Sequence, residues 1–335
     1  MIGTNDLISE RSAWRGSALG GKEGLVYQFT EAHLAQMHQL MEETRHLPID
    51  AVTREMFDAP GLTAFLAEVA DELANGRGAA ILRGLSREKY SEDELTRMFW
   101  GIGTHLGVPR PQNYNGNRID YVTDLGTENN PLKRRQYGTE ELIFHTDGII
   151  GQNLALLSLC KSKSGGLSKL CSGLAIHNEF LRKRPDLLEL LYEGFPYDRK
   201  GKQRPGMSQI SPYPVPVFSR IDGIVSVQYI RDYMLTAGET IGMPALFREA
   251  LDTFDAFAND PDMNVTFMLE PGEIEILNNR AVLHSRTQFE DYPEPERRRR
   301  LVRLWMDVPD GRPYKATMDY LERGPSFGKR ETVSA

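Results

Sequence analysis

The chain has 335 residues, 40% hydrophobic and 26% charged, which is ordinary for a soluble globular protein with a large core. Its formal charge of −7 argues against a nucleic-acid partner. The sequence has no apolar run of about 18 residues and starts with a polar segment (1–24), so we expect a cytoplasmic protein with no membrane partner. We therefore also expect Cys160 and Cys171 to be reduced thiols.

The first third of the chain has the spacing of amphipathic helices. Predicted helices begin at Thr30, Pro60 and Ser91 and end near Pro48, Asn75 and Gly107. Ser91 and Glu94 form a capping box, which marks the third start. A short apolar run bounded by glycines (78–84) predicts one buried strand before it. The histidines on these helices are expected to be structural.

After Pro111 the pattern changes to short strands separated by turns, with a polar loop expected over 124–140. The predicted strands cover 118–123, 141–147, 154–160, 167–172, 215–221, 224–230, 264–269, 273–277, 282–286 and 299–308. Most of the remaining helical pattern lies in one insert, around 176–260. This order predicts a mainly β fold with flanking helices and a sandwich or jelly-roll core.

We predict a single domain over residues 1–335. Its parts are an N-terminal arm with helices (1–75), the jelly-roll core (76–315) and a C-terminal tail (316–335). The sequence leaves the oligomeric state open.

The stretch 141–147 is expected to deliver two metal-ligand side chains to one face of a strand. Because side chains alternate along a strand, His145 and Asp147 point the same way. His284 lies in another predicted strand, where Val282 and Arg286 share its face. Two imidazoles and one carboxylate can hold an iron ion on one face of an octahedron, which leaves three positions open.

The last predicted strand is unusually basic for a core element. Arg299, Leu301, Arg303 and Trp305 would share one of its faces. A guanidinium that points into a core needs a carboxylate to pair with, and a bidentate pair is the usual solution. The alternative is that this charged run is a solvated face.

Four motifs in this order resemble those of the TauD/TfdA family of iron(II)- and 2-oxoglutarate-dependent dioxygenases, part of the clavaminate-synthase-like group. They are His145-Thr146-Asp147, Gly165-Gly166-Leu167-Ser168, Asn279-Arg280 followed by His284, and Arg299 followed by Arg303. The resemblance covers about 76–313. It implies a double-stranded β-helix core and catalytic iron ligands His145, Asp147 and His284.

The resemblance also implies cosubstrate and substrate contacts. Ser168 and Arg299 match the residues that bind the 2-oxoglutarate carboxylate, and Arg303 matches one that faces substrate in some members. The spacing before Arg299 is longer than in taurine-type members, so the neighbouring arginines Arg298 and Arg300 are alternative clamps. Arg231 is either a second substrate contact or a surface arginine on its strand.

The implied reaction consumes dioxygen and 2-oxoglutarate, releases succinate and carbon dioxide, and oxidises an unactivated C–H bond of a small molecule. Hydroxylation is favoured, because halogenating relatives lack the carboxylate that Asp147 supplies; desaturation, epoxidation and cyclisation stay open. An amino acid or a carboxylate-bearing metabolite is a plausible substrate. Two alternatives are a zinc-dependent hydrolase with the same ligands and a non-catalytic binding module of the same fold.

Overall fold

The computed structural model describes residues 6–112, 116–123, 138–148 and 151–322. The greater part of the predicted loop (124–140) and the end of the predicted tail lie outside these residues. The helices are α1 (Glu31–Glu43), α2 (Pro60–Ala74), α3 (Glu92–Leu106), α4 (Gly173–Lys183), α5 (Pro185–Glu193), α6 (Arg231–Ile241) and α7 (Ala245–Asn259).

The strands form two main sheets. A seven-stranded sheet among the described residues has the order β1 (Val26–Gln28), β2 (Ala79–Arg83), β12 (Ile274–Asn278), β6 (Asn153–Cys160), β15 (Arg300–Asp307) and β3 (Val108–Pro109), with β4 (Ile119–Thr123) also paired to β15. A four-stranded sheet has the order β11 (Asn264–Phe267), β8 (Ser168–Ser172), β13 (Val282–Arg286) and β5 (Leu142–His145). Except for the parallel pair β1–β2, neighbouring strands in both sheets are antiparallel.

Two small pairs complete the strand set. They are the hairpin of β9 (Phe218–Ile221) with β10 (Ile224–Val227), and β7 (Ser164–Gly165) with β14 (Phe289–Glu290). Asp222 and Gly223 both have positive φ, as a type I′ turn between the strands of the first hairpin requires.

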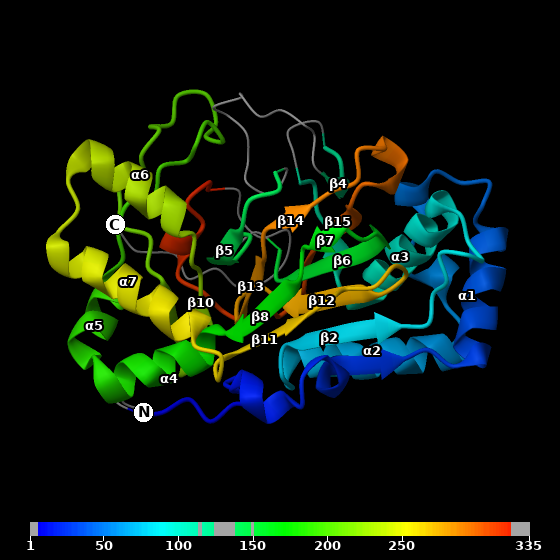
Figure 1. Ribbon diagram of the computed structural model, residues 1–335, viewed down its shortest axis with the longest axis horizontal. Coiled ribbons are helices and arrows are strands. Elements are labelled where there is room, and N and C mark those ends of the chain that lie inside the picture. The colour runs from blue at the N-terminus through cyan, green and yellow to red at the C-terminus, as the bar shows by residue number, and fades with distance from the viewer. Residues whose placement is uncertain (1–5, 113–115, 124–137, 149–150, 323–335) are drawn as a thin grey trace.

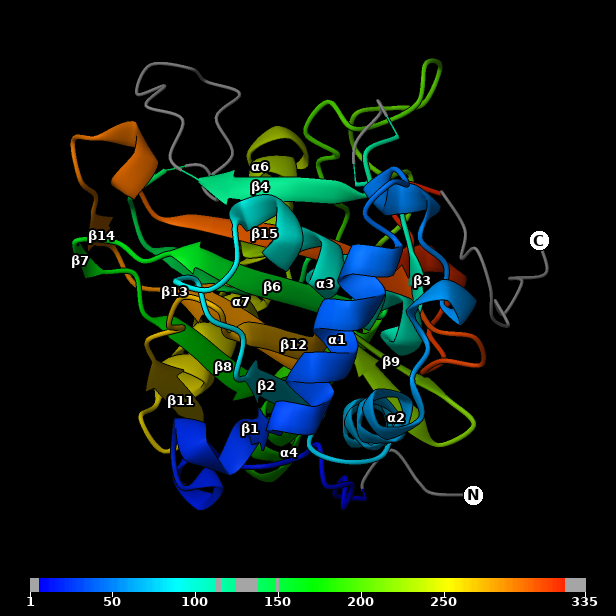
Figure 2. The same ribbon diagram turned by 90° about the vertical axis from the view of Figure 1, so that its right-hand side faces the viewer.

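Helices cover the sheets from opposite sides. Helices α1, α2 and α3 lie on the outer face of the large sheet (Figure 2), while α4 to α7 gather at the other end of the molecule (Figure 1). Alternate residues of β6 pack on opposite faces of the large sheet. Ala155, Leu157 and Leu159 pack against α1–α3, and Leu154 packs into the core on the other face. The near-continuous apolar run of β6 is therefore buried on both faces of the sheet.

Most helix boundaries follow the predicted signals. Thr30 and Ser91 cap α1 and α3 with capping boxes, and Pro60 opens α2. One prediction was wrong: the strand expected to continue to Ile230 ends at Val227, and Arg231 begins α6 instead of lying on a strand. The start of the predicted tail is packed, with Met318 and Tyr320 buried.

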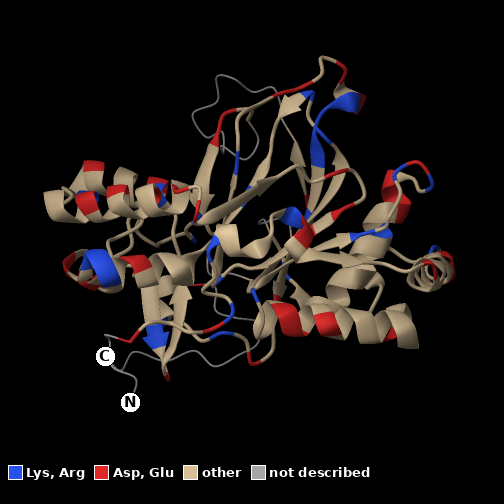
Figure 3. Ribbon diagram, turned by 60° about the horizontal axis from the view of Figure 1, so that its bottom comes forward, with Lys and Arg blue, Asp and Glu red and all other residues tan. Residues whose placement is uncertain are grey.

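Both cysteines are free thiols, as predicted, and they lie in different sheets. The helices in Figure 3 carry more acidic than basic residues, and α1, α2 and α5 contain no Lys or Arg, in line with the negative net charge. Within the described residues, no helix combines the length and the apolarity needed to cross a membrane.

Candidate functional site

Strand pairing brings the two candidate imidazole ligands together. His145 on β5 and His284 on β13 are direct register partners, and their ring centroids are 4.2 Å apart. The position of Asp147 differs from the prediction. The predicted strand included Asp147, whereas β5 ends at His145 and Asp147 lies in the loop that follows. Asn279 holds this loop: its Oδ1 accepts from the Asp147 N–H at 2.9 Å, and its amide group donates to the Gly148 carbonyl.

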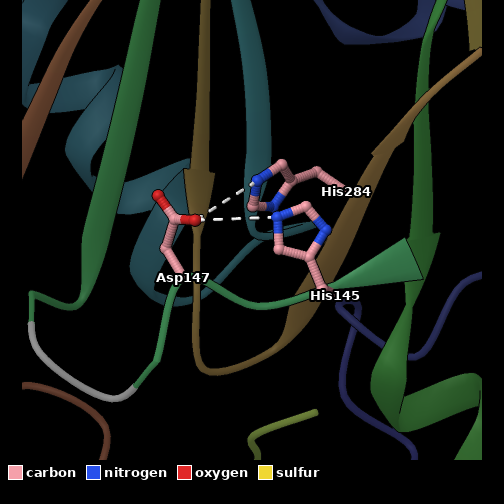
Figure 4. A group of neighbouring side chains, drawn as sticks. All are labelled: His145, Asp147 and His284. Carbon is pink, nitrogen blue, oxygen red and sulfur yellow. Dashed lines mark ion pairs between the residues drawn. The ribbon is translucent and has the colours of Figure 1, made fainter. Parts of the chain in front are cut away.

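The three side chains converge on one point (Figure 4). Asp147 Oδ1 lies 3.6 Å from His145 Nε2 and 3.8 Å from His284 Nε2, and one ligand atom from each residue falls within 4.8 Å of the others. The other His145 ring nitrogen, Nδ1, lies 2.8 Å from the Ile143 carbonyl, which orients Nε2 toward the site. Two imidazole nitrogens and one carboxylate oxygen therefore form a donor set that suits iron(II).

The second carboxylate oxygen of Asp147 is held away from this point. Trp305 Nε1 donates to Oδ2 at 2.8 Å, and Arg303 Nη1 donates to the same atom at 3.1 Å. Burial alone would raise the pKa of Asp147, but Arg303 and the two imidazoles lower it well below its ordinary value. The carboxylate is thus an anion with Oδ1 directed to the histidines, which favours binding through a single oxygen.

Arg303 is almost fully engaged by protein groups. Besides Asp147 it donates from Nε to Gln112 at 2.7 Å and from Nη2 to Asp120 at 3.0 Å. Its side chain is buried, at 5% exposure. These contacts supply the carboxylate partners that the sequence required for an inward-pointing arginine, and they make Arg303 a support of the metal ligand. Its predicted contact with substrate stays a prediction.

A cavity between the two sheets contains the three ligands. Its lining combines polar groups with an apolar wall: Val122, Leu142, His145, Asp147, Leu154, Leu156, Ser168, Glu275, His284, Ser285, Arg286, Arg299, Leu301 and Arg303. The predicted cosubstrate residues Ser168 and Arg299 therefore open into the same cavity as the ligands. Strand alternation predicted Arg286 on the face of His284 but indicated no role for it, and no sequence motif indicated a role for Glu275.

Ser168 reaches the cavity through a tight glycine turn. Gly165 and Gly166 have φ values of 67° and 69°, a left-handed conformation that glycine adopts easily. A Cβ atom on Gly165 would lie 2.2 Å from the Gln288 carbonyl oxygen, so this close approach needs glycine. The turn starts β8 with Ser168 opposite Arg286 of β13.

The three neighbouring arginines before and at the start of β15 point to different places. Arg298 donates to the carbonyls of Tyr292 and Pro293, and Arg300 forms an ion pair with Glu92. Only Arg299 of the three lines the cavity. Burial, then the nearby charge of Arg286, lowers the pKa of Arg299 to about 9. The geometry therefore favours Arg299 over its neighbours as the group that meets an anion there.

Glu275 is a buried acid in the middle of the large sheet. It is 2% exposed, and within the described residues its Oε2 has no hydrogen-bond partner. Burial raises its pKa to about 7, although the Ser168 hydroxyl and the charge of Arg299 act in the opposite direction. The sequence signal was a single acid inside the apolar strand of Ile274, Ile276 and Leu277.

Arg231 lies away from this cavity lining. It forms ion pairs with Asp255 at 3.0 Å and with Asp252, both on α7. Its predicted role in substrate binding therefore has no geometric support in the described structure. The helix histidines are also separate from the cluster: His105 Nε2, for example, lies 2.8 Å from the Phe57 carbonyl.

The three candidate ligands have the composition of a mononuclear non-haem iron site of the 2-His-1-carboxylate type. The chain belongs to the taurine catabolism dioxygenase TauD, TfdA family, whose model matches residues 43–305. It is accordingly a dioxygenase that depends on iron(II), 2-oxoglutarate and dioxygen.

Similar proteins span nearly the whole chain. An FR-33289 synthase of Streptomyces rubellomurinus is 28% identical over 320 residues, covering 93% of each chain. A taurine hydroxylase-like protein of Stachybotrys chartarum is 29% identical over 313 residues, which is 89% of this chain and 79% of that protein. An asparagine oxygenase solved with Fe(II), 3-hydroxyasparagine and succinate has the same fold, with a TM-score of 0.66 and 16% identity over 84% of this chain and 93% of its own.

Proposed function

We propose that this dioxygenase hydroxylates an unactivated C–H bond of a small molecule. The observation that carries the proposal is that one cavity joins the three ligand atoms to Arg299 and Ser168. Arg299 and Ser168 suit the binding of a carboxylate cosubstrate, which zinc-dependent hydrolysis does not require. A non-catalytic module would have no need of a complete ligand set. In this proposal the core is a double-stranded β-helix formed by the two opposed sheets.

Each residue has a distinct part in the proposed reaction. His145, His284 and Oδ1 of Asp147 would hold iron(II), and Arg299 with Ser168 would hold the distal carboxylate of 2-oxoglutarate. When bound, the metal and cosubstrate supply the oxidising power by consuming dioxygen and releasing succinate and carbon dioxide. The leucines of the cavity wall exclude water and leave room for an aliphatic substrate group.

The structure changes the argument about the substrate. Because Arg303 already donates to Gln112, Asp120 and Asp147, it gives little reason to expect an acidic substrate. Arg286 is a better candidate for an anionic group, because it lines the cavity on the same strand as His284. Solved structures of the same fold contain hydroxylated amino acids, 3-hydroxyasparagine in one and (3R,4R)-dihydroxy-L-arginine in another. We therefore propose a small amino-acid or carboxylate-bearing substrate.

The proposal is tested by succinate release. Purified protein with iron(II), 2-oxoglutarate and dioxygen is offered a panel of amino acids and small carboxylates, and a substrate should raise succinate formation well above the uncoupled rate with one hydroxylated product per succinate. Anaerobic protein with both cofactors should also show a weak visible charge-transfer band that neither component gives alone. Tight zinc binding with no such band and no succinate would refute the proposal in favour of the hydrolase.

A further inference from the structure

Glu275 stands out because a carboxyl group has been placed where an anion is expected to bind. It lines the cavity together with Ser168 and Arg299, the two residues proposed to hold 2-oxoglutarate. The positive charge of Arg299 acts on Glu275, and the charge of Glu275 acts in return on Arg299. Glu275 and the cosubstrate carboxylate would therefore share the same two partners.

Strand register fixes Glu275 in this position. One row of register partners crosses four neighbouring strands. Glu275 of β12 pairs with Leu156 of β6, and Leu156 pairs with Arg303 of β15. Arg303 in turn pairs with Asp120 of β4. Register partners in a sheet point to the same face, so this row points into the cavity. The central strand β12 is paired on both sides, by β2 and β6. The acid is consequently unable to turn away to solvent when a second anion enters.

Several ionisable groups lie around Glu275. The ionisable groups that share its cavity are Arg299 and Arg303 at β15, Arg286 and His284 on β13, and His145 and Asp147 from β5. Lys22 approaches from the N-terminal segment, but its ammonium group binds Glu273 at 2.5 Å and the Met268 carbonyl. On β2, Arg83 pairs with Glu23 and Glu273, and on α2, Glu72 pairs with Arg77. Among these cations, Arg299 has the larger charge effect on Glu275 and Lys22 the smaller one, and both favour the ionised carboxylate against the effect of burial.

We propose that Glu275 takes up one proton when 2-oxoglutarate binds and then donates a hydrogen bond to the carboxylate that Arg299 and Ser168 hold. This inference rests on the proposed function. Two carboxylates that share Arg299 and Ser168 repel each other strongly in a buried site, because their charges are poorly screened there, and protonation of one of them removes this repulsion. The proton comes from solvent, and no bond other than the one to hydrogen changes.

The size of the effect follows from the ligand-free titration. With Glu275 titrating near pH 7 before binding, cosubstrate binding should take up about nine tenths of a proton at pH 8 and about one tenth at pH 6. The dissociation constant for 2-oxoglutarate should accordingly increase roughly tenfold from pH 6 to pH 8. A purely structural counter-ion of Arg299 would have the same protonation state with and without 2-oxoglutarate and would produce neither change.

The experiment is calorimetric titration of 2-oxoglutarate into the iron(II)-loaded protein under anaerobic conditions. Repeating it in buffers with different ionisation enthalpies gives the number of protons taken up. Glu275→Gln keeps a hydrogen-bond donor but cannot titrate. In this variant the proton uptake on binding should vanish, and the affinity for 2-oxoglutarate should change less than about threefold between pH 6 and pH 8. Glu273→Gln is the matched control, because Glu273 pairs with Lys22 and Arg83 and does not line the cavity. Proton uptake on binding of 2-oxoglutarate should persist in this variant.

An infrared measurement keeps the test independent of whether the variants fold. In the natural protein, the difference spectrum on adding 2-oxoglutarate at pH 8 should gain the carbonyl stretch of a protonated carboxyl group. Binding without proton uptake, or uptake that persists in Glu275→Gln, would overturn the inference while leaving the proposed function intact. No binding of 2-oxoglutarate at all would instead overturn the proposed function, and the inference with it.

Discussion

The hydrogen bond from Trp305 to Asp147 predicts a measurable contribution to iron affinity. Trp305→Phe removes the N–H that lies 2.8 Å from Oδ2 but keeps an aromatic ring beside Arg303, whose guanidinium carbon is 4.6 Å from the indole ring centre. A hydrogen bond to a charged group contributes about 1.5–3 kcal/mol. Because Arg303 still donates to the same oxygen, we expect a loss at the lower end of this energy range, about 1.5 kcal/mol, which corresponds to roughly tenfold weaker iron(II) binding.

The assay is anaerobic competition for iron(II) with a chromophoric chelator. Trp100→Phe is the matched control, because it removes an equivalent indole donor, 2.9 Å from the Val52 carbonyl, away from the cavity lining. The control should lower thermal stability and leave iron affinity within about twofold. Unchanged affinity in Trp305→Phe, or an equal loss in both variants, would refute the argument that Trp305 orients the ligand.

Three further predictions concern the same cavity. Asp147→Ala should reduce turnover below detection while thermal unfolding monitored by circular dichroism stays cooperative; full activity in this variant would disprove the ligand assignment. Arg299→Lys should raise the Michaelis constant for 2-oxoglutarate at least tenfold, because lysine lacks the bidentate fork, whereas Arg298→Lys should leave it within twofold. Glu275→Leu should remove one pH dependence of stability. The folded-state pKa of about 7, against an ordinary 4.5, makes the free energy of unfolding fall by about 2.5 kcal/mol as pH rises from 5 to 8, and chemical denaturation should show the fall to be smaller by this amount in the variant.

Local signals predicted most of the secondary structure because each rests on nearby residues. The capping residues Thr30 and Ser91 and the alternating apolar pattern of the strands were sufficient for those elements. Helix α6 was missed because its start at Arg231 has no side-chain cap and its interior contains Gly238, a poor helix former. Its position is set by tertiary packing, since Met234, for example, is fully buried.

The candidate ligands were predicted correctly as a cluster, but the path to Asp147 was not. The prediction assumed a continuous strand, whereas the loop after His145 depends on Asn279, a residue far along the chain. The contacts of Arg303 were also out of reach of the sequence, because they depend on the register between β15 and β4. Local patterns therefore indicate which residues face inward, and long-range pairing decides what they meet there.

The position of β5 at the edge of its sheet has a consequence for local unfolding. Within the described residues β5 pairs only with β13, and the register shifts between His284 and Arg286. Two candidate ligands lie on or just after this weakly held strand, and the third lies on its neighbour. A bound metal ion would therefore cross-link the two strands, so backbone amides of 142–147 should exchange hydrogen faster when the metal is removed, while those of the central strand β6 should keep their protection.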